Sequence, residues 1–170
     1  MCLEKLYRKS VSQMVSYLIF TTILVIIDQI TKYLTVQNID LYEVVEVIPN
    51  IVSFTYIQNT GAAFSILEGK MWFFYIITAL VIGVLIYFMY SEAKNDKLLG
   101  YLLALILAGA IGNFIDRLLL QYVVDMIKLE FIDFAIFNVA DSYLTVGVIM
   151  LMIYTFYDER KTLKENNGDE

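Results

Sequence analysis

The chain has 170 residues and a net charge of −6, and 59% of its residues are apolar while 18% are charged. A soluble domain carries about a quarter charged residues, so this composition favours a membrane protein. The sequence has no histidine and one cysteine, Cys2, which excludes Ser-His catalysis, His-ligated metal sites, disulfide frameworks and thiolate zinc sites. The acidic balance argues against nucleic-acid binding. Any catalysis must use carboxylates, amides, hydroxyls, lysine or arginine.

Four stretches of the chain lack charged residues, and they are Val11–Ile27, Met71–Ser91, Leu98–Ile115 and Ser142–Tyr157. A helix needs about 17–25 apolar residues to cross a bilayer, so the first and last stretches must borrow flanking residues. A soluble helical bundle would show polar residues returning at every third or fourth position, and the segment Phe73–Tyr90 shows no such return. We therefore predict an α-helical integral membrane protein with four transmembrane helices, over about residues 12–34, 70–91, 98–119 and 139–158.

The first apolar stretch also has the basic flank of a secretory signal peptide, because Lys5, Arg8 and Lys9 precede it. No small-x-small cleavage site follows it, and the chain continues as Asp28-Gln29-Ile30-Thr31-Lys32. We interpret this stretch as a retained helix.

The basic residues are distributed unevenly between the two sides of the predicted bundle. Eight of the twelve precede the first helix, lie between the second and third, or follow the fourth: Lys5, Arg8, Lys9, Lys94, Lys97, Arg160, Lys161 and Lys164. The remaining four are Lys32, Lys70, Arg117 and Lys128. Because cytoplasmic flanks are enriched in lysine and arginine, we expect both termini to be cytoplasmic.

The two outer connections have the composition of β-strands. Residues 40–58 carry β-branched and aromatic residues on both sides of Pro49-Asn50, which predicts a hairpin, and residues 122–135 are also β-rich. We expect a small antiparallel β-sheet on the outer membrane face. The last residues, 159–170, are predicted to form a polar tail, and residues 1–170 a single polytopic domain without internal repeats.

Polar residues interrupt the predicted helices at helical spacing. Asp28 and Lys32 are four residues apart, in the favourable order for a helical ion pair. Asn113, Asp116 and Arg117 share one face of the third helix. A charged residue near the bilayer centre costs about 2.5–3.5 kcal/mol, so these groups must pair or lie near water. We interpret Asp28–Lys32 and Asp116–Arg117 as structural pairs.

Two further polar segments are predicted at the same depth. Asn138 and Asp141 lie at the start of the fourth helix, and the loop Asn59-Thr60-Gly61-Ala62-Ala63-Phe64 precedes the second helix. Because the first and third helices run outward and the fourth runs inward, all four clusters should converge near the outer leaflet.

Carboxylates are the most economical catalytic groups for a chain without histidine. Two carboxyl groups in a low-dielectric site share one proton, and the pair can activate water and polarise a carbonyl. The outer-side candidates are Asp28, Asp116, Asp125, Asp133 and Asp141. Asp125 and Asp141 lack a cation at helical spacing and are preferred, while spacing leaves Asp133 as an alternative.

Five motifs in order resemble the lipoprotein signal peptidases (signal peptidase II), membrane aspartic peptidases of bacteria. They are Asp28-Gln29-Ile30-Thr31-Lys32, Asn59-Thr60-Gly61-Ala62-Ala63-Phe64, Gly109-Ala110-Ile111-Gly112-Asn113-Phe114-Ile115-Asp116-Arg117, Val123-Val124-Asp125 and Phe137-Asn138-Val139-Ala140-Asp141. Met126 stands where many members carry an aromatic residue, and Ile136 where many carry proline, which affects the local loop shape.

This resemblance implies an endopeptidase of the bacterial cytoplasmic membrane that removes signal peptides from diacylglyceryl-modified prolipoproteins, cutting before the lipid-bearing cysteine. It implies Asp125 and Asp141 as the catalytic dyad, membrane lipids as partners, inhibition by globomycin-type peptides, and no metal or organic cofactor. We expect a monomer, with the active site towards the outer leaflet. The supporting residues are expected to be Asp28, Lys32, Asn59, Gly61, Ala63, Asn113, Asp116, Arg117, Asn138 and Ala140, with the three asparagines holding substrate or scaffold carbonyls.

Two other classes of membrane protein remain as alternatives. A proton- or cation-coupled transporter would also place acids in its helices, but transporter ion sites lie near the midplane of repeated halves, and no repeat is visible here. A membrane scaffold without catalysis would not need five polar motifs at one depth. Cleavage of a lipidated prolipoprotein distinguishes the peptidase from a transporter, which would show ion flux instead.

Overall fold

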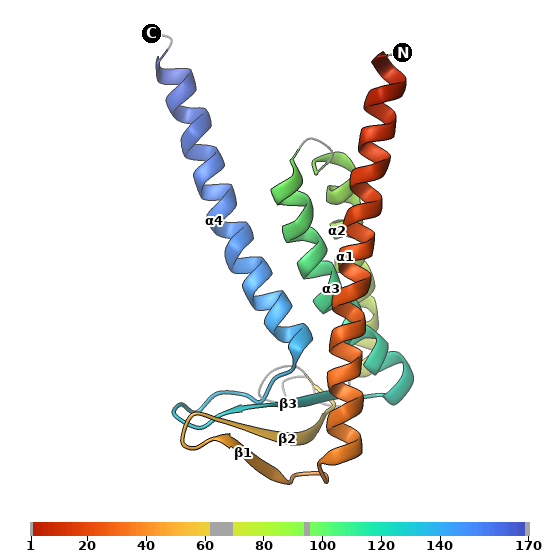
Figure 1. Ribbon diagram of the computed structural model, residues 1–170, viewed down its shortest axis with the longest axis vertical. Coiled ribbons are helices and arrows are strands. Elements are labelled where there is room, and N and C mark those ends of the chain that lie inside the picture. Colours follow the sequence, from red (N-terminus) through yellow and green to blue (C-terminus); the bar gives the residue numbers. More distant parts are fainter. Residues whose placement is uncertain (1, 62–69, 94–95, 169–170) are drawn as a thin grey trace.

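A computed structural model describes residues 2–61, 70–93 and 96–168, with side chains described for residues 10–61, 70–93 and 96–160. These residues form four long helices and one three-stranded sheet (Figure 1). In chain order the elements are α1 (Cys2–Asn38), β1 (Val44–Ile48), β2 (Val52–Asn59), α2 (Met71–Ser91), α3 (Lys97–Leu120), β3 (Val123–Leu129) and α4 (Val139–Gly168).

The helices contain four segments that are long and apolar enough to cross a membrane, which confirms the predicted architecture. These segments are Ser10–Asn38, Met71–Ser91, Lys97–Leu120 and Val139–Arg160. The third is the central one, because most of its residues are buried and it contacts each of the other three helices. The other three segments expose most of their apolar side chains, as expected for surfaces that face lipid.

Two helices are longer than the sequence predicted. The first begins at Cys2, before the predicted residue 12. The fourth continues to Gly168, so most of the segment predicted as a polar tail from residue 159 is helical. Residues 158–167 are polar except for Leu163, but they include several good helix formers and no proline, and the helix ends at the first glycine after Gly147.

The sheet lies at one end of the bundle, and both chain termini lie at the other end (Figure 1). β1 and β2 pair in antiparallel register across a turn at Pro49-Asn50, which confirms the predicted hairpin. Asn50 adopts a φ of 59°, a left-handed conformation that asparagine tolerates. β3 pairs antiparallel with β2, giving the order β1-β2-β3. Beyond β3, Phe137 forms an isolated antiparallel bridge with Ile127 of that strand.

The contact between α3 and α4 depends on the absence of a side chain at Gly109. A Cβ atom there would lie 2.5 Å from the Ala140 carbonyl oxygen and 2.7 Å from Leu144 Cγ. The first of these atoms belongs to the backbone at the start of α4, so it cannot move aside without moving the helix.

We therefore expect Gly109→Ala to destabilise the protein by about 1–3 kcal/mol, as overpacking does, and to lower its melting temperature in detergent. Gly83→Ala on α2 is the matched control, because nothing lies within 4 Å of its Cβ position. That variant should melt at or slightly above the wild-type temperature, since alanine is the better helix former. Equal melting temperatures for the two variants would contradict this packing argument.

Candidate active site

A buried lysine connects α1 to α3 at the end of the bundle near the sheet. Lys32 Nζ lies 3.0 Å from Asp28 Oδ2 and 2.9 Å from Asp116 Oδ2, and it donates to Asn113 Oδ1 at 3.0 Å. All four side chains are buried. The predicted ion pair between Asp28 and Lys32 is therefore confirmed, and its cation serves a second carboxylate.

The predicted pairing of Asp116 with Arg117 is wrong. Adjacent residues on a helix point about 100° apart, so Asp116 faces α1 and Arg117 does not. The Arg117 guanidinium instead donates to the Gly61 carbonyl oxygen at 3.4 Å and lies 4.7 Å above the Phe74 ring. Lys32 is the cation that balances Asp116.

The two acids beside Lys32 also hold the backbone of the segments that carry the predicted dyad. Asp28 Oδ1 accepts a hydrogen bond from the Ala140 backbone N–H at 2.9 Å. Asp116 Oδ2 accepts one from the Val124 backbone N–H at 3.1 Å. Ala140 precedes Asp141 and Val124 precedes Asp125, so one cation anchors both candidate catalytic residues through its two acids.

Gln29 belongs to this network, although no role was predicted for it beyond its place in the motif. Its Nε2 donates to Asp116 Oδ1 at 2.9 Å, to the Gly112 carbonyl oxygen at 3.2 Å and to Asp28 Oδ2 at 3.2 Å. A polar amide next to Asp28 within a membrane helix was the available signal. Gly112 is required as well, since a Cβ there would lie 2.5 Å from Asp28 Oδ2.

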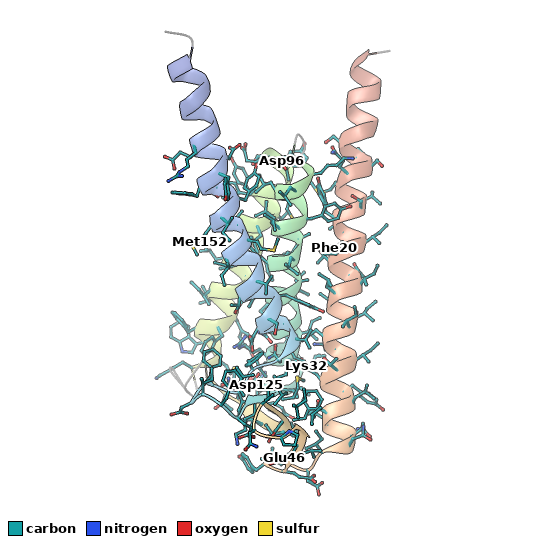
Figure 2. The ribbon with its side chains drawn as sticks, turned by 60° about the vertical axis from the view of Figure 1, so that its left-hand side comes forward. Phe20, Lys32, Glu46, Asp96, Asp125 and Met152 are labelled. Atoms are coloured by element: carbon teal, nitrogen blue, oxygen red, sulfur yellow. The ribbon has the colours of Figure 1, made fainter. Side chains whose placement is uncertain are left out.

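The predicted dyad residues come together at the wall of one cavity. Asp125 lies in the middle of β3 and Asp141 in the first turn of α4. The cavity, called the dyad cavity below, has a volume of about 470 Å³ and is lined by both aspartates, Asn59, Asn113 and Arg117 together with largely apolar residues such as Phe134. In Figure 2 Asp125 lies near Lys32, at the end of the molecule opposite to Asp96.

Three asparagines hold the two carboxylates. Asn138 Nδ2 donates to Asp125 Oδ1 at 2.7 Å, and Asn59 Nδ2 donates to Asp125 Oδ2 at 2.8 Å. Asn113 Nδ2 donates to Asp141 Oδ1 at 2.7 Å. We expected these amides to hold substrate or scaffold carbonyls, and the structure instead commits each of them to a carboxylate of the dyad.

Asn138 and Asp141 form a reciprocal cap at the start of α4. The Asp141 backbone N–H donates to Asn138 Oδ1 at 2.9 Å, and the Asn138 backbone N–H donates to Asp141 Oδ2 at 3.1 Å. This is a capping box with aspartate at the third position. Because Asn138 also donates to Asp125, the residue that starts the helix fixes the two carboxyl groups relative to each other.

The environments of the two carboxyl groups differ. Asp125 is 2% exposed, and burial together with the nearby Asp141 carboxylate raises its pKa to about 7. Asp141 is partly exposed, lies in the first turn of α4 and accepts two hydrogen bonds, from Asn113 Nδ2 and from the Asn138 backbone N–H. Asp125 therefore changes its protonation state near neutral pH.

The other residues expected at the site divide into three groups. Ala140 is fully buried against Asp28, and the Gly61 backbone N–H donates to Asn59 Oδ1 at 2.9 Å. Asp133, the open alternative, is exposed and does not line the dyad cavity. Ala63 lies outside the described residues.

Comparison with known proteins places this architecture in a family. The family model described as signal peptidase (SPase) II matches residues 20–157. A lipoprotein signal peptidase of Enterococcus faecalis is 52% identical over 155 residues, covering 91% of this chain and 96% of that protein. A lipoprotein signal peptidase of Streptococcus pyogenes serotype M1 is 56% identical over 137 residues, covering 81% of this chain and 90% of that protein.

Solved structures agree with this result. A bacterial membrane enzyme determined by the in meso method at 2.3 Å resolution aligns with a TM-score of 0.81 and 41% identity, covering 85% of this chain and 89% of that one. A second bacterial membrane enzyme, determined at 1.9 Å, aligns with a TM-score of 0.77 and 42% identity. The fold, the residues around the dyad cavity and these similarities lead to one conclusion: the chain belongs to the signal peptidase II family of bacterial membrane peptidases.

Proposed function

We propose that this peptidase removes the signal peptide from diacylglyceryl-modified prolipoproteins and cuts before the lipid-modified cysteine, with Asp125 and Asp141 as an aspartic dyad. The observation that carries the proposal is the joint placement of the two carboxyl groups on the dyad cavity, bridged by Asn138. The names of the relatives supply the class of substrate, since they are lipoprotein signal peptidases.

The proton of the dyad resides on Asp125 in the resting enzyme. Its burial disfavours the charged form, whereas Asp141 is partly exposed and its carboxyl group accepts two hydrogen bonds in the first turn of α4. This assigns Asp141 as the general base and Asp125 as the acid that polarises the scissile carbonyl. Arg117, which lines the same cavity, adds a positive charge near the developing oxyanion.

Hydrolysis then proceeds in two steps. Asp141 takes a proton from a water molecule whose oxygen attacks the scissile carbonyl carbon, while Asp125 gives its proton to the carbonyl oxygen. The tetrahedral intermediate returns the proton of its hydroxyl to Asp125 as the C–N bond breaks. Asp141 gives its proton to the leaving amine, which is the new N-terminus of the lipidated cysteine.

The distribution of basic residues supports an orientation with both termini in the cytoplasm and the sheet on the outer face of the cytoplasmic membrane. The dyad cavity reaches Val146 on α4, within a membrane-spanning segment, so a lipidated substrate can enter from the bilayer. In this proposal the enzyme acts as a monomer, and globomycin-type peptides inhibit it by occupying the dyad cavity.

The function is tested by incubating the purified protein with a diacylglyceryl-modified prolipoprotein and measuring the product mass. We expect a loss equal to the mass of the signal peptide, with the lipidated cysteine at the new N-terminus. The same precursor without the lipid is the matched control and should be cut far more slowly. An intact lipidated precursor after prolonged incubation, or ion flux without cleavage, would contradict the proposal.

The pH profile of cleavage should report the proton on Asp125. Because the active form requires that proton, kcat/KM should be retained as the pH falls just below 7. It should fall about tenfold per unit as the pH rises above the Asp125 pKa of about 7. The measurement is a rate series at subsaturating substrate, with melting curves at each pH to confirm that the enzyme stays folded. A rate that keeps rising from pH 7 to 9 would rule out a protonated Asp125.

A further inference from the structure

A second cavity lies behind the strand that carries Asp125. It has a volume of about 350 Å³ and is lined by the last turns of α1, Phe54 of β2, Met126 and Ile127 of β3, and Val139 of α4. Asp125 of β3 borders the dyad cavity, while Met126 and Ile127 border this second cavity. The two spaces are therefore separated by β3.

The lining of the second cavity offers almost no polar groups to a ligand, because its polar side chains are used within α1. Thr31 Oγ1 donates to the Asp28 carbonyl oxygen at 2.7 Å, and Thr35 Oγ1 donates to the Thr31 carbonyl oxygen at 2.9 Å. Asn38 Nδ2 donates to the Leu34 carbonyl oxygen at 2.7 Å. No charged residue is among the described residues that line it. The surfaces left for a ligand are methyl and methylene groups, which favour a hydrocarbon.

The position of the second cavity along α1 gives it access to lipid. The segment Ser10–Asn38 has 29 residues, about 44 Å of helix at 1.5 Å per residue, against a hydrocarbon thickness of about 30 Å. The last turns of α1 therefore lie at the hydrocarbon boundary, where the exposed Tyr33 is the expected type of anchor. Leu34, which lines the cavity, and Ile30 are each 51% exposed, so the cavity wall continues into the lipid-facing surface.

We infer that this second cavity binds an acyl chain of a bilayer phospholipid, as a site distinct from the dyad cavity. The occupant is a bilayer lipid because the wall of the cavity is continuous with the surface that lipid already covers. In the proposed function, on which this distinction rests, the acyl chains of a substrate are tethered to a cysteine in the dyad cavity, which Asp125 borders and which lies on the other face of β3. A chain bound here packs against Met126 and Val139, the neighbours of Asp125 and Asn138, and so supports both dyad segments from behind.

The test uses the full protein in phosphatidylcholine vesicles that contain a phosphatidylcholine with a diazirine near the middle of one acyl chain. After irradiation, labelled positions are mapped by mass spectrometry. Met126 is the decisive residue, because it is 3% exposed and lipid outside the cavity cannot reach it. We expect labelling of Met126 clearly above background, at a lower yield than the lipid-facing Ile76, which is 60% exposed.

Filling the second cavity should displace the lipid. Thr35→Phe places a ring in it and should lower Met126 labelling at least fivefold, with Leu34→Phe as a second variant if the first fails to fold. Val36→Phe is the matched control, because Val36 lies on the same helix but does not line the cavity. Background labelling of Met126 in the wild type would overturn the inference. Loss of the label on adding a diacylglyceryl-modified peptide would also overturn it, since the cavity would then belong to the substrate.

Discussion

Asp125→Asn should abolish cleavage of the lipidated precursor while leaving the protein folded and inserted in the membrane. The amide cannot share the dyad proton or deliver it to the scissile carbonyl, so we expect kcat/KM to fall by on the order of 10⁴. The side chain keeps its size in a site that is 2% exposed. The new amide can accept only one of the two hydrogen bonds that Asn59 and Asn138 donate, which lowers the stability of the folded state. This loss is offset because the variant no longer buries a carboxyl group whose pKa is raised to about 7.

The matched control for this variant is Asp133→Asn, which makes the same chemical change at an exposed position outside the dyad cavity. It should cleave at the wild-type rate, and that result would also exclude the alternative that spacing left open. Asp141→Asn should be as inactive as Asp125→Asn. Substantial cleavage by either dyad variant, or loss of activity in Asp133→Asn alone, would show that the dyad is assigned wrongly.

Lys32→Met should unfold part of the site, because it leaves Asp28 and Asp116 buried without their cation. Breaking a buried ion pair by removing one partner costs about 3–5 kcal/mol, and here two carboxylates lose the same partner. These acids hold the backbone N–H groups of Ala140 and Val124, so the segments that carry Asp141 and Asp125 should lose their anchors together. We expect a much lower melting temperature and a loss of cleavage.

Lys70→Met is the control for Lys32→Met, since Lys70 is exposed at the start of α2. It should melt and cleave like the wild type. The double variant that also carries Asp28→Asn should recover part of the lost stability, because one buried charge is then absent. A Lys32→Met protein that melts at the wild-type temperature would show that the network does not hold the dyad segments.

The transmembrane helices and the hairpin could be predicted from the sequence because each depends on local patterns. Uncharged stretches such as Met71–Ser91 have one stable arrangement in a bilayer, and Pro49-Asn50 between β-branched residues specifies a turn. The convergence of the polar clusters also followed from local information, since the direction of each helix places its polar end. The sequence therefore predicted which end of the bundle carries the polar clusters, but not the contacts between their side chains.

The contacts inside the site could not be predicted because they depend on how the helices are rotated and offset against each other. Spacing along one helix pairs Asp116 with Arg117, but the rotation of α3 against α1 decides that Lys32 is its partner. In the same way, only the approach of α4 to β3 shows that Asn138 donates to Asp125 and not to a substrate carbonyl. Gln29 is a related case, since its three partners come from two helices.

The central claim is that two carboxylates direct a water molecule at the scissile bond, and a single turnover in water enriched in oxygen-18 tests it most directly. With enzyme in excess over lipidated precursor, the new carboxylate at the C-terminus of the released signal peptide should carry one oxygen-18 atom from solvent, and Asp125 and Asp141 should carry none. An unlabelled signal peptide, with oxygen-18 found in either aspartate, would contradict the account, because the aspartate itself would then have attacked the carbonyl.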